Sequence, residues 1–145
     1  MPITPHGIMQ TGGCQCGAVR YDVTGKPRAL YVCHCRECQK QSASAFGISV
    51  IMNSADVHLR QGELHHWSRA TDSGRRLDCF FCPRCGTRLW HGDKARDATI
   101  SVKGGSLDQP VDLSHAIHIW TSRKLAGLCI PDGATHYPEE PPDDS

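Results

Sequence analysis

Residues 76–91 read RLDCFFCPRCGTRLWH, and this stretch decides which kind of fold to expect. Residues 76–81 alternate in polarity, a pattern typical of a β-strand with one buried face. The turn from Cys82 to Gly86 follows, and residues 87–91 have the composition of a second strand. Two cysteines three positions apart in such a turn are typical of a zinc knuckle. We therefore predict a strand, a knuckle and a second strand here.

Short apolar runs predict a mainly β protein along the rest of the chain. Further strands are expected over 18–23, 29–32, 45–52, 57–62, 64–67, 98–102 and 115–120. Of these, 57–62 and 64–67 are expected to pair with each other through a turn at Gly62. Only residues 35–43 have a helical pattern, of about two turns. The expected fold is β-sheet with one short helix.

Length and charge limit the classes of protein that fit. A chain of 145 residues is the size of one domain, and we expect a single zinc-binding domain over residues 1–137. Residues 138–145, PEEPPDDS, are acidic and proline-rich, so we predict a mobile tail. A net charge of +1 argues against a nucleic-acid or membrane partner, and no stretch is apolar enough for a membrane span. The first ten residues lack the features of a secretory signal, so a cytoplasmic location is expected.

The cysteine content is the unusual feature of this composition. Nine cysteines occur, at positions 14, 16, 33, 35, 38, 79, 82, 85 and 129. A disulfide framework is the simplest alternative, but the number is odd and the expected compartment keeps thiols reduced. Seven of the nine also lie two or three positions apart, where a disulfide would be strained. Metal binding is the better interpretation.

The seven clustered cysteines divide naturally into two zinc sites. Two close pairs give a closed site of four thiolates, made by Cys14, Cys16, Cys82 and Cys85. The remaining stretch CHCREC supplies three more, Cys33, Cys35 and Cys38. Structural zinc sites are closed, whereas catalytic sites keep one position open. We therefore predict one structural and one catalytic Zn²⁺.

The charge of the open site favours a thiol substrate. Zn²⁺ with three thiolates carries a net charge of −1, which makes it a poor Lewis acid for hydrolysis. It would still hold an incoming thiol as thiolate, because a coordinating thiol loses its proton. A thiol nucleophile attacking a small electrophile fits this site better than a hydrolytic reaction does.

A family resemblance joins these motifs along the chain. The segments that carry it are GGCQCGAVRYDV (12–23), CHCRECQKQSASAF (33–46), FFCPRCGTRLW (80–90), KGGSLDQP (103–110), HIWTSRK (118–124) and IPDG (130–133). In this order they resemble the glutathione-dependent formaldehyde-activating family, also called GFA/CENP-V. The resemblance implies an Mss4-like zinc-binding β-sheet fold, a structural zinc on the four paired cysteines and a catalytic zinc on Cys33, Cys35 and Cys38. It further implies a carbon–sulfur lyase that joins glutathione to formaldehyde as S-hydroxymethylglutathione.

Other candidate residues have less specific interpretations. Cys79 and Cys129 are expected to be small buried apolar side chains. His34 is expected to have an orienting role or to be exposed. Arg36 and Lys40 could offset the charge of the open site or contact a glutathione carboxylate, but a solvated helix face is an equal alternative.

Three other functions are alternatives to the enzyme. A zinc-ribbon module for nucleic acid or protein is suggested by seven Arg and Lys against three Asp in residues 69–96, but a closed ribbon does not need the additional thiols. A zinc nucleobase deaminase is excluded because the chain has no H-x-E motif. A non-catalytic thiol-binding carrier or redox sensor would use the same cleft without turnover, and it remains an alternative.

Overall fold

The computed structural model describes residues 9–142, and the contacts within it divide the chain into two compact units. Unit 1 comprises residues 9–29 and 50–111, and unit 2 comprises residues 30–49 and 112–142. The strand β4 (Gly47–Asn53) carries the chain from unit 2 into unit 1. The prediction of a mainly β protein with one short helix is confirmed.

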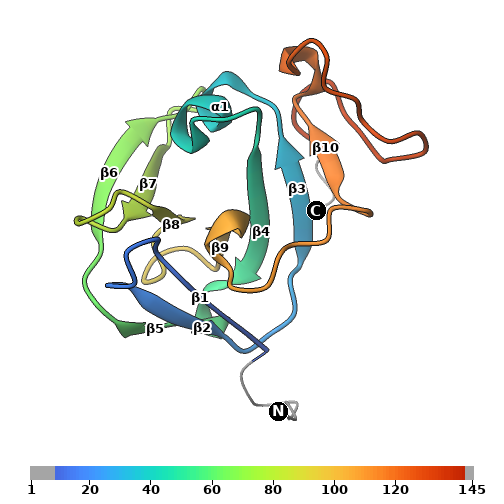
Figure 1. Cartoon of the computed structure of the whole chain (residues 1–145). Coiled ribbons are helices and arrows are strands. Elements are labelled where there is room, and N and C mark those ends of the chain that lie inside the picture. Colours follow the sequence, from blue (N-terminus) through green and yellow to red (C-terminus); the bar gives the residue numbers. More distant parts are fainter. Residues whose placement is uncertain (1–8, 143–145) are drawn as a thin grey trace. The chain divides into compact units, whose positions relative to one another are not determined.

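The first sheet of unit 1 is antiparallel and has the order β1-β2-β5. Its strands are β1 (Gln10–Gly13), β2 (Arg20–Val23) and β5 (Val57–Gln61), which lie side by side in Figure 1. The sequence did not predict β1, because its glycines have low strand propensity. Glycine is required at position 12, since a Cβ there would lie 2.5 Å from Cζ of Tyr21.

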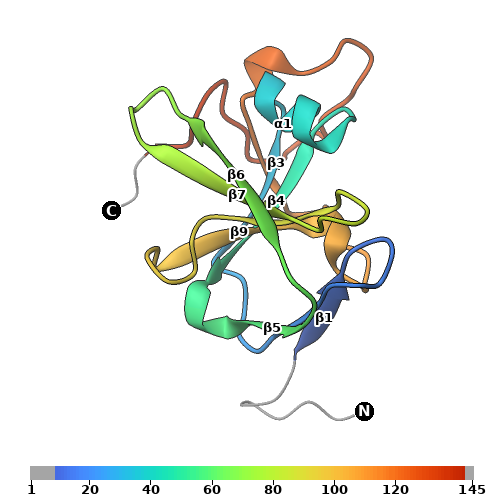
Figure 2. The same cartoon turned by 90° about the vertical axis from the view of Figure 1, so that its left-hand side faces the viewer.

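The second sheet of unit 1 contains the predicted knuckle. Its antiparallel strands are β6 (His65–Ala70), β7 (Arg76–Phe81), β8 (Arg88–His91) and β9 (Thr99–Lys103), and Figure 2 shows β6 and β7 side by side. Short 3₁₀ turns, η1 (Ser54–Asp56) and η2 (Gly104–Ser106), precede β5 and follow β9. The strand–knuckle–strand prediction is confirmed, because β7 pairs with β8.

The expected pairing of the two strands around Gly62 is wrong. Strand β5 pairs with β2, whereas β6 pairs with β7. Gly62 does turn the chain, with φ of +88°, but its backbone lies so close to Ala18 that a Cβ would be 2.3 Å from the Ala18 oxygen. The turn therefore passes the chain from one sheet to the other instead of folding it back into a hairpin.

The core of unit 1 lies between these two sheets. Tyr21 of β2 meets Trp90 of β8 edge to face, with ring centroids 5.5 Å apart. The Tyr21 hydroxyl and the hydroxyl of Ser106 are 2.6 Å apart and hydrogen-bonded in the interior. Burial raises the pKa of Tyr21 to about 12, because it disfavours the phenolate.

Unit 2 is built around β3 (Ala29–Cys33), which pairs in parallel with β10 (Ile117–Ile119). The helix α1 (Arg36–Ser42) follows β3 and agrees with the predicted helix. The amide of Gln39 ties this helix to both neighbouring segments, donating to the carbonyl oxygens of His34 at 2.8 Å and Arg123 at 3.0 Å. Arg123 ends the turn η3 (Thr121–Arg123).

Part of the predicted tail lies against this turn. The Trp120 N–H donates to the Glu139 carbonyl at 3.0 Å, and its indole N–H donates to the Glu140 carboxylate at 2.7 Å. Residues 143–145 of the predicted tail lie outside the described residues.

Within residues 9–142, none of the helices has the length and apolar character that crossing a membrane would require.

Candidate metal centres

The first group of thiols joins two distant segments of unit 1. The sulfur atoms of Cys14, Cys16, Cys82 and Cys85 all lie within 4.8 Å of one another. The Cys14 and Cys16 sulfurs are 3.6 Å apart, and those of Cys16 and Cys82 are 3.8 Å apart. A tetrahedral ion with metal–sulfur distances of about 2.3 Å places its sulfurs about 3.8 Å apart. The spacing therefore matches one metal ion with four thiolates, and it is far too long for a disulfide.

The backbone around this group turns tightly and points N–H groups at sulfur. The Val19 N–H donates to the Cys14 sulfur at 3.2 Å, and the Arg84 N–H donates to the Cys82 sulfur at 3.4 Å. The knuckle closes with the Gly86 N–H donating to the Cys82 carbonyl at 2.8 Å, and Gly86 has φ of +81°. Glycine is suited to that backbone conformation. Such donors stabilise thiolate over thiol.

The charge state of Cys85 follows from these contacts. The Thr87 hydroxyl lies 3.2 Å from the Cys85 sulfur, and the backbone N–H groups of Thr87 and Cys16 add to it. Together they lower the pKa of Cys85 to about 5. A thiolate, the form that binds metal, is favoured at this position before any ion is present.

The second group of thiols lies in unit 2, where β3 ends and α1 begins. The sulfur atoms of Cys33, Cys35 and Cys38 lie within 4.8 Å of one another. Within residues 9–142, no further histidine, carboxylate or thiol joins this group. A tetrahedral metal ion bound by these three thiolates would keep its fourth coordination position free for a ligand from outside the chain.

Two features of the local fold hold this trio together. Cys35 is the N-cap of α1, and its sulfur accepts the Cys38 N–H at 3.3 Å. Gly47, at the start of β4, lies against the helix, and a Cβ there would be 3.1 Å from Cβ of Cys38 and 3.3 Å from its sulfur. The close approach of this strand therefore depends on the absence of a side chain at position 47.

The electrostatics of the trio favour one shared negative charge. Donation from the Cys33 and Cys38 thiols lowers the pKa of Cys35 to about 2, despite the opposing effect of burial. The pKa of Cys33 is raised, because its thiol donates to Cys35 and Cys38 and because it is buried. A cation at the centre of the trio would remove this competition by stabilising all three thiolates.

His34 does not join the metal ligands, and the expectation that it might be exposed is wrong. Its side chain is fully buried, and its Nε2 lies 3.0 Å from Nδ1 of His118. The ring also packs against Phe46, with centroids 5.7 Å apart. Burial lowers the pKa of His34, with His118 and Lys124 adding to the effect, so the ring is neutral. No sequence signal indicated this contact, because His34 and His118 are 84 positions apart.

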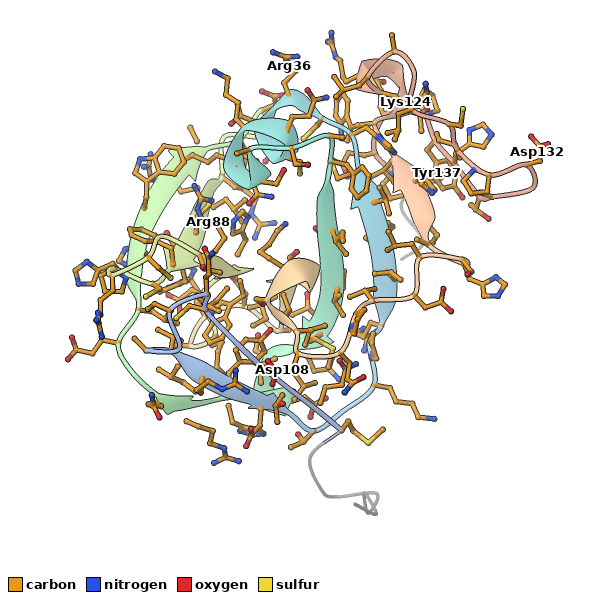
Figure 3. All side chains as sticks on the ribbon, viewed as in Figure 1. Arg36, Arg88, Asp108, Lys124, Asp132 and Tyr137 are labelled. Carbon is orange, nitrogen blue, oxygen red and sulfur yellow. The ribbon has the colours of Figure 1, made fainter. Side chains whose placement is uncertain are left out.

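The predictions for the two unclustered cysteines and for the charged residues of α1 have different outcomes. Cys79 is fully buried, as predicted, but Cys129 is exposed in a loop, so its predicted burial is wrong. Arg36 and Lys40 lie on the exposed face of α1, in agreement with the solvated-face alternative. Figure 3 shows Arg36 at the outer side of the helix.

Comparison with known proteins confirms the family resemblance. Residues 9–123 match the family model described as "Glutathione-dependent formaldehyde-activating enzyme". The crystal structure of a Rhodobacter sphaeroides protein, a structural genomics target, is 22% identical to this chain with a TM-score of 0.57. That similarity covers 74% of this chain and 98% of the other, and it supports the fold.

Proposed function

Because the chain belongs to the family of glutathione-dependent formaldehyde-activating enzymes, we propose that it is a zinc-dependent carbon–sulfur lyase. In this proposal the chain binds glutathione or a related thiol and joins it to a small aldehyde such as formaldehyde. The observation that carries the proposal is the group of three thiols at Cys33, Cys35 and Cys38, which lacks a fourth ligand within residues 9–142.

The donor set of this group fits zinc. Three sulfur ligands are typical of Zn²⁺ and unsuited to Mg²⁺ or Ca²⁺, which prefer oxygen. The three cysteines would hold the ion, with Cys35 fixed by its N-cap contact and Cys38 by its place on the helix. When bound, zinc supplies an open position at which a substrate thiol is held as a thiolate nucleophile.

The proposed reaction is an addition that needs no reactant other than the thiol and the aldehyde. The thiol sulfur gives its electron pair to the carbonyl carbon, and a carbon–sulfur bond forms. The carbon–oxygen double bond becomes single, and the proton lost by the thiol ends on the new hydroxyl. The reverse reaction breaks the same carbon–sulfur bond, and for this reason the enzyme is classed as a carbon–sulfur lyase.

The four-thiol group supports a second, structural role for zinc. Its four sulfurs have the spacing of one tetrahedral ion, which leaves no position for a substrate. We propose that zinc on Cys14, Cys16, Cys82 and Cys85 stabilises unit 1. With both sites occupied, metal analysis should give about two zinc ions per chain.

The proposed partners and location follow from the same chemistry. Glutathione and a small aldehyde are the substrates, and no nucleic acid or membrane is required. Seven cysteines that must stay reduced suit the cytoplasm, and all nine cysteines are free thiols in the structure.

The decisive experiment measures exchange between free aldehyde and its glutathione adduct by proton NMR. The adduct also forms spontaneously, so only a rate above that of buffer with free zinc counts. We expect an increase that grows with protein concentration. A rate equal to the spontaneous one would contradict the enzyme and leave a thiol-binding module.

The variant Cys35→Ser tests the role of the three thiols. Serine is a good N-cap, so the helix is retained while one sulfur ligand is lost. We expect about one zinc per chain instead of two, loss of glutathione binding and an unchanged melting temperature for unit 1. Retention of glutathione binding by this variant would overturn the assignment of the site.

A further inference from the structure

The residue between two of the proposed metal ligands is held from several sides within unit 2. His34 separates Cys33 from Cys35, so its position sets how the chain turns between their sulfur atoms. Its backbone N–H donates to the Ile119 carbonyl at 3.0 Å, and its carbonyl accepts from the Gln39 amide at 2.8 Å. Both hydrogen-bonding groups of the His34 backbone are therefore fixed.

The imidazole ring of His34 is anchored in the interior of unit 2. It is fully buried and packs against Phe46, and its Nε2 lies 3.0 Å from Nδ1 of His118. Its Nδ1 is also buried and has no partner within residues 9–142. A buried N–H group without an acceptor is rarer than a buried acceptor without a donor. The neutral ring therefore carries its proton on Nε2 and donates it to Nδ1 of His118.

The acceptor His118 is itself held firmly in β10. Its backbone N–H donates to the Thr135 carbonyl at 2.9 Å, and its carbonyl accepts from the Tyr137 N–H at 2.9 Å. Strand β10 also pairs in parallel with β3, the strand that ends in the first ligand of the three-thiol group. Thr135 and Tyr137 lie beyond the residues 9–123 that match the family model, so this support comes from outside the matched region.

We propose that His118 is a positioning residue for the metal centre of Cys33, Cys35 and Cys38, and that it acts through the ring of His34. Without its acceptor the buried N–H of His34 would be left unsatisfied, so the ring would turn to find another partner. The chain between the first two ligands would then move with the ring. Metal–ligand distances tolerate deviations of only about 0.2 Å, so a small displacement weakens the site.

The inference rests on the metal binding proposed above for the three-thiol group, but not on the reaction proposed there. Hydrogen-bond partners behind metal ligands typically contribute about 10–100-fold to metal affinity. A residue that merely stabilises unit 2 would change its melting temperature without changing the geometry around the metal. The two roles are therefore separated by measuring the site itself.

The test measures metal binding by the full chain in two ways. Competition with a chelator gives the zinc affinity of the three-thiol group. The visible absorption of Co²⁺ in place of zinc reports the geometry of its thiolate ligands. The variant Cys35→Ser gives the spectrum of the four-thiol group alone, which is subtracted. Thermal unfolding checks that every variant is folded.

Four variants vary the contact between the two rings. His118→Leu removes the acceptor, whereas His118→Asn places a carbonyl oxygen near the position of Nδ1. His118→Gln carries its amide further out, near the position of Nε2, and serves in place of His118→Leu if that variant does not fold. His34→Phe keeps a ring against Phe46 but has no N–H to donate. The double variant of His34→Phe and His118→Leu tests whether His118 acts through His34.

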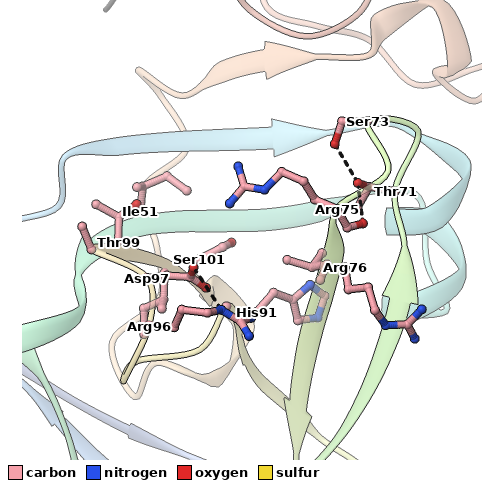
Figure 4. A pocket seen from close by; sticks show the side chains of 14 residues that line it. Ile51, Thr71, Ser73, Arg75, Arg76, His91, Arg96, Asp97, Thr99 and Ser101 are labelled. Carbon is pink, nitrogen blue, oxygen red and sulfur yellow. Dashed lines mark hydrogen bonds and ion pairs between the residues drawn. The ribbon is translucent and has the colours of Figure 1, made fainter.

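Two control variants lose a comparable hydrogen bond elsewhere. His91 in unit 1 is 8% exposed, as His118 is, and it lines the groove shown in Figure 4. A bulge where β7 pairs with β8 brings Arg88 to the side of His91, and its Nη1 lies 3.0 Å from Nε2 of that ring. His91→Leu removes this contact. Thr121→Val removes the hydroxyl that donates to the Tyr137 carbonyl at 3.2 Å in unit 2.

We expect His118→Leu and His34→Phe each to weaken zinc binding at the three-thiol group about tenfold and to change the Co²⁺ spectrum. The double variant should bind zinc no more weakly than either single variant, because the two changes remove the same contact. His118→Asn should stay within about threefold of wild type. His91→Leu and Thr121→Val should keep the wild-type affinity and spectrum, even where their melting temperature falls.

The inference is overturned if folded His118→Leu, or His118→Gln in its place, binds zinc within about twofold of wild type with an unchanged Co²⁺ spectrum. It is also overturned if Thr121→Val weakens the site as much, since the effect would then be general to unit 2. A wild-type chain without metal at the three-thiol group would refute both the inference and the proposed metal centre. If His118→Leu weakens the site but the wild type shows no turnover, the positioning role stands and only the proposed reaction fails.

Discussion

The substitution Gly47→Ala tests how closely the open thiol site depends on its surroundings. A methyl group at position 47 would lie 3.1 Å from Cβ of Cys38, 3.3 Å from its sulfur and 2.9 Å from Nε2 of Gln41. The Gln41 amide is the end of a flexible side chain and can rotate away. Cys38 cannot, because it is part of α1 and its sulfur belongs to the three-thiol group.

The size of the effect follows from these distances. Carbon atoms in ordinary contact are about 3.5–4.0 Å apart, so Cys38 and the strand must separate by about 0.4 Å or more. Metal–ligand distances tolerate deviations of only about 0.2 Å. We expect the strain to lower the free energy of unfolding by about 1–3 kcal/mol. We also expect zinc affinity at the three-thiol site to fall about tenfold or more.

Zinc competition with a chelator measures the affinity, and urea denaturation measures the stability. The control is Gly105→Ala, because a Cβ at position 105 meets no atom within 4 Å and the glycine has ordinary backbone angles. The four-thiol group is a second control, since its zinc should be retained in both variants. Equal zinc affinity and equal stability in Gly47→Ala and Gly105→Ala would refute the reasoning.

Two further predictions concern unit 1. Cys85→Ser should lose the structural zinc and unfold unit 1, which would be measured as loss of one zinc per chain and of the near-ultraviolet circular dichroism. The control Cys129→Ser, at an exposed position, should behave as wild type. A folded Cys85→Ser variant would contradict the structural role. The raised pKa of Tyr21, from its unfolded value of 10.0 to about 12, predicts stability that is fully present below pH 10 and is lost as the pH rises to about 12. The loss is about 2–3 kcal/mol, and urea denaturation at several alkaline pH values should show it in wild type but not in Tyr21→Phe. An unchanged pH dependence in Tyr21→Phe would rule out this cause.

The short-range features were predictable from the sequence because local spacing determines them. The helix over 35–43 and the knuckle strands were expected from periodicity within a few residues, and both are present. The spacing of the seven cysteines also indicated the two groups that the structure brings together. Ligands two or three positions apart are neighbours in most backbone conformations, so the spacing alone carries this information.

The long-range features were not predictable in this way. The partner of β5 depends on where Gly62 sends the chain after it, and no residue of either strand encodes that choice. Cys129 was expected to be buried because Leu128 and Ile130 flank it, but it lies in an exposed loop. The side on which Arg88 lies depends on a bulge, which shifts the alternation on which face assignments rest.

The four-thiol group also has a consequence for how the polypeptide is made. Its first two cysteines precede the other two by 66 positions, measured from Cys16 to Cys82. At synthesis rates of about 5–20 residues per second, the early thiols are synthesised roughly 3–13 seconds before the later pair. During that interval the nascent N-terminal segment has only two of the four thiolates that a tetrahedral zinc ion needs. The finished polypeptide must then close a long loop, at an entropic cost of about 4 kcal/mol that metal capture offsets.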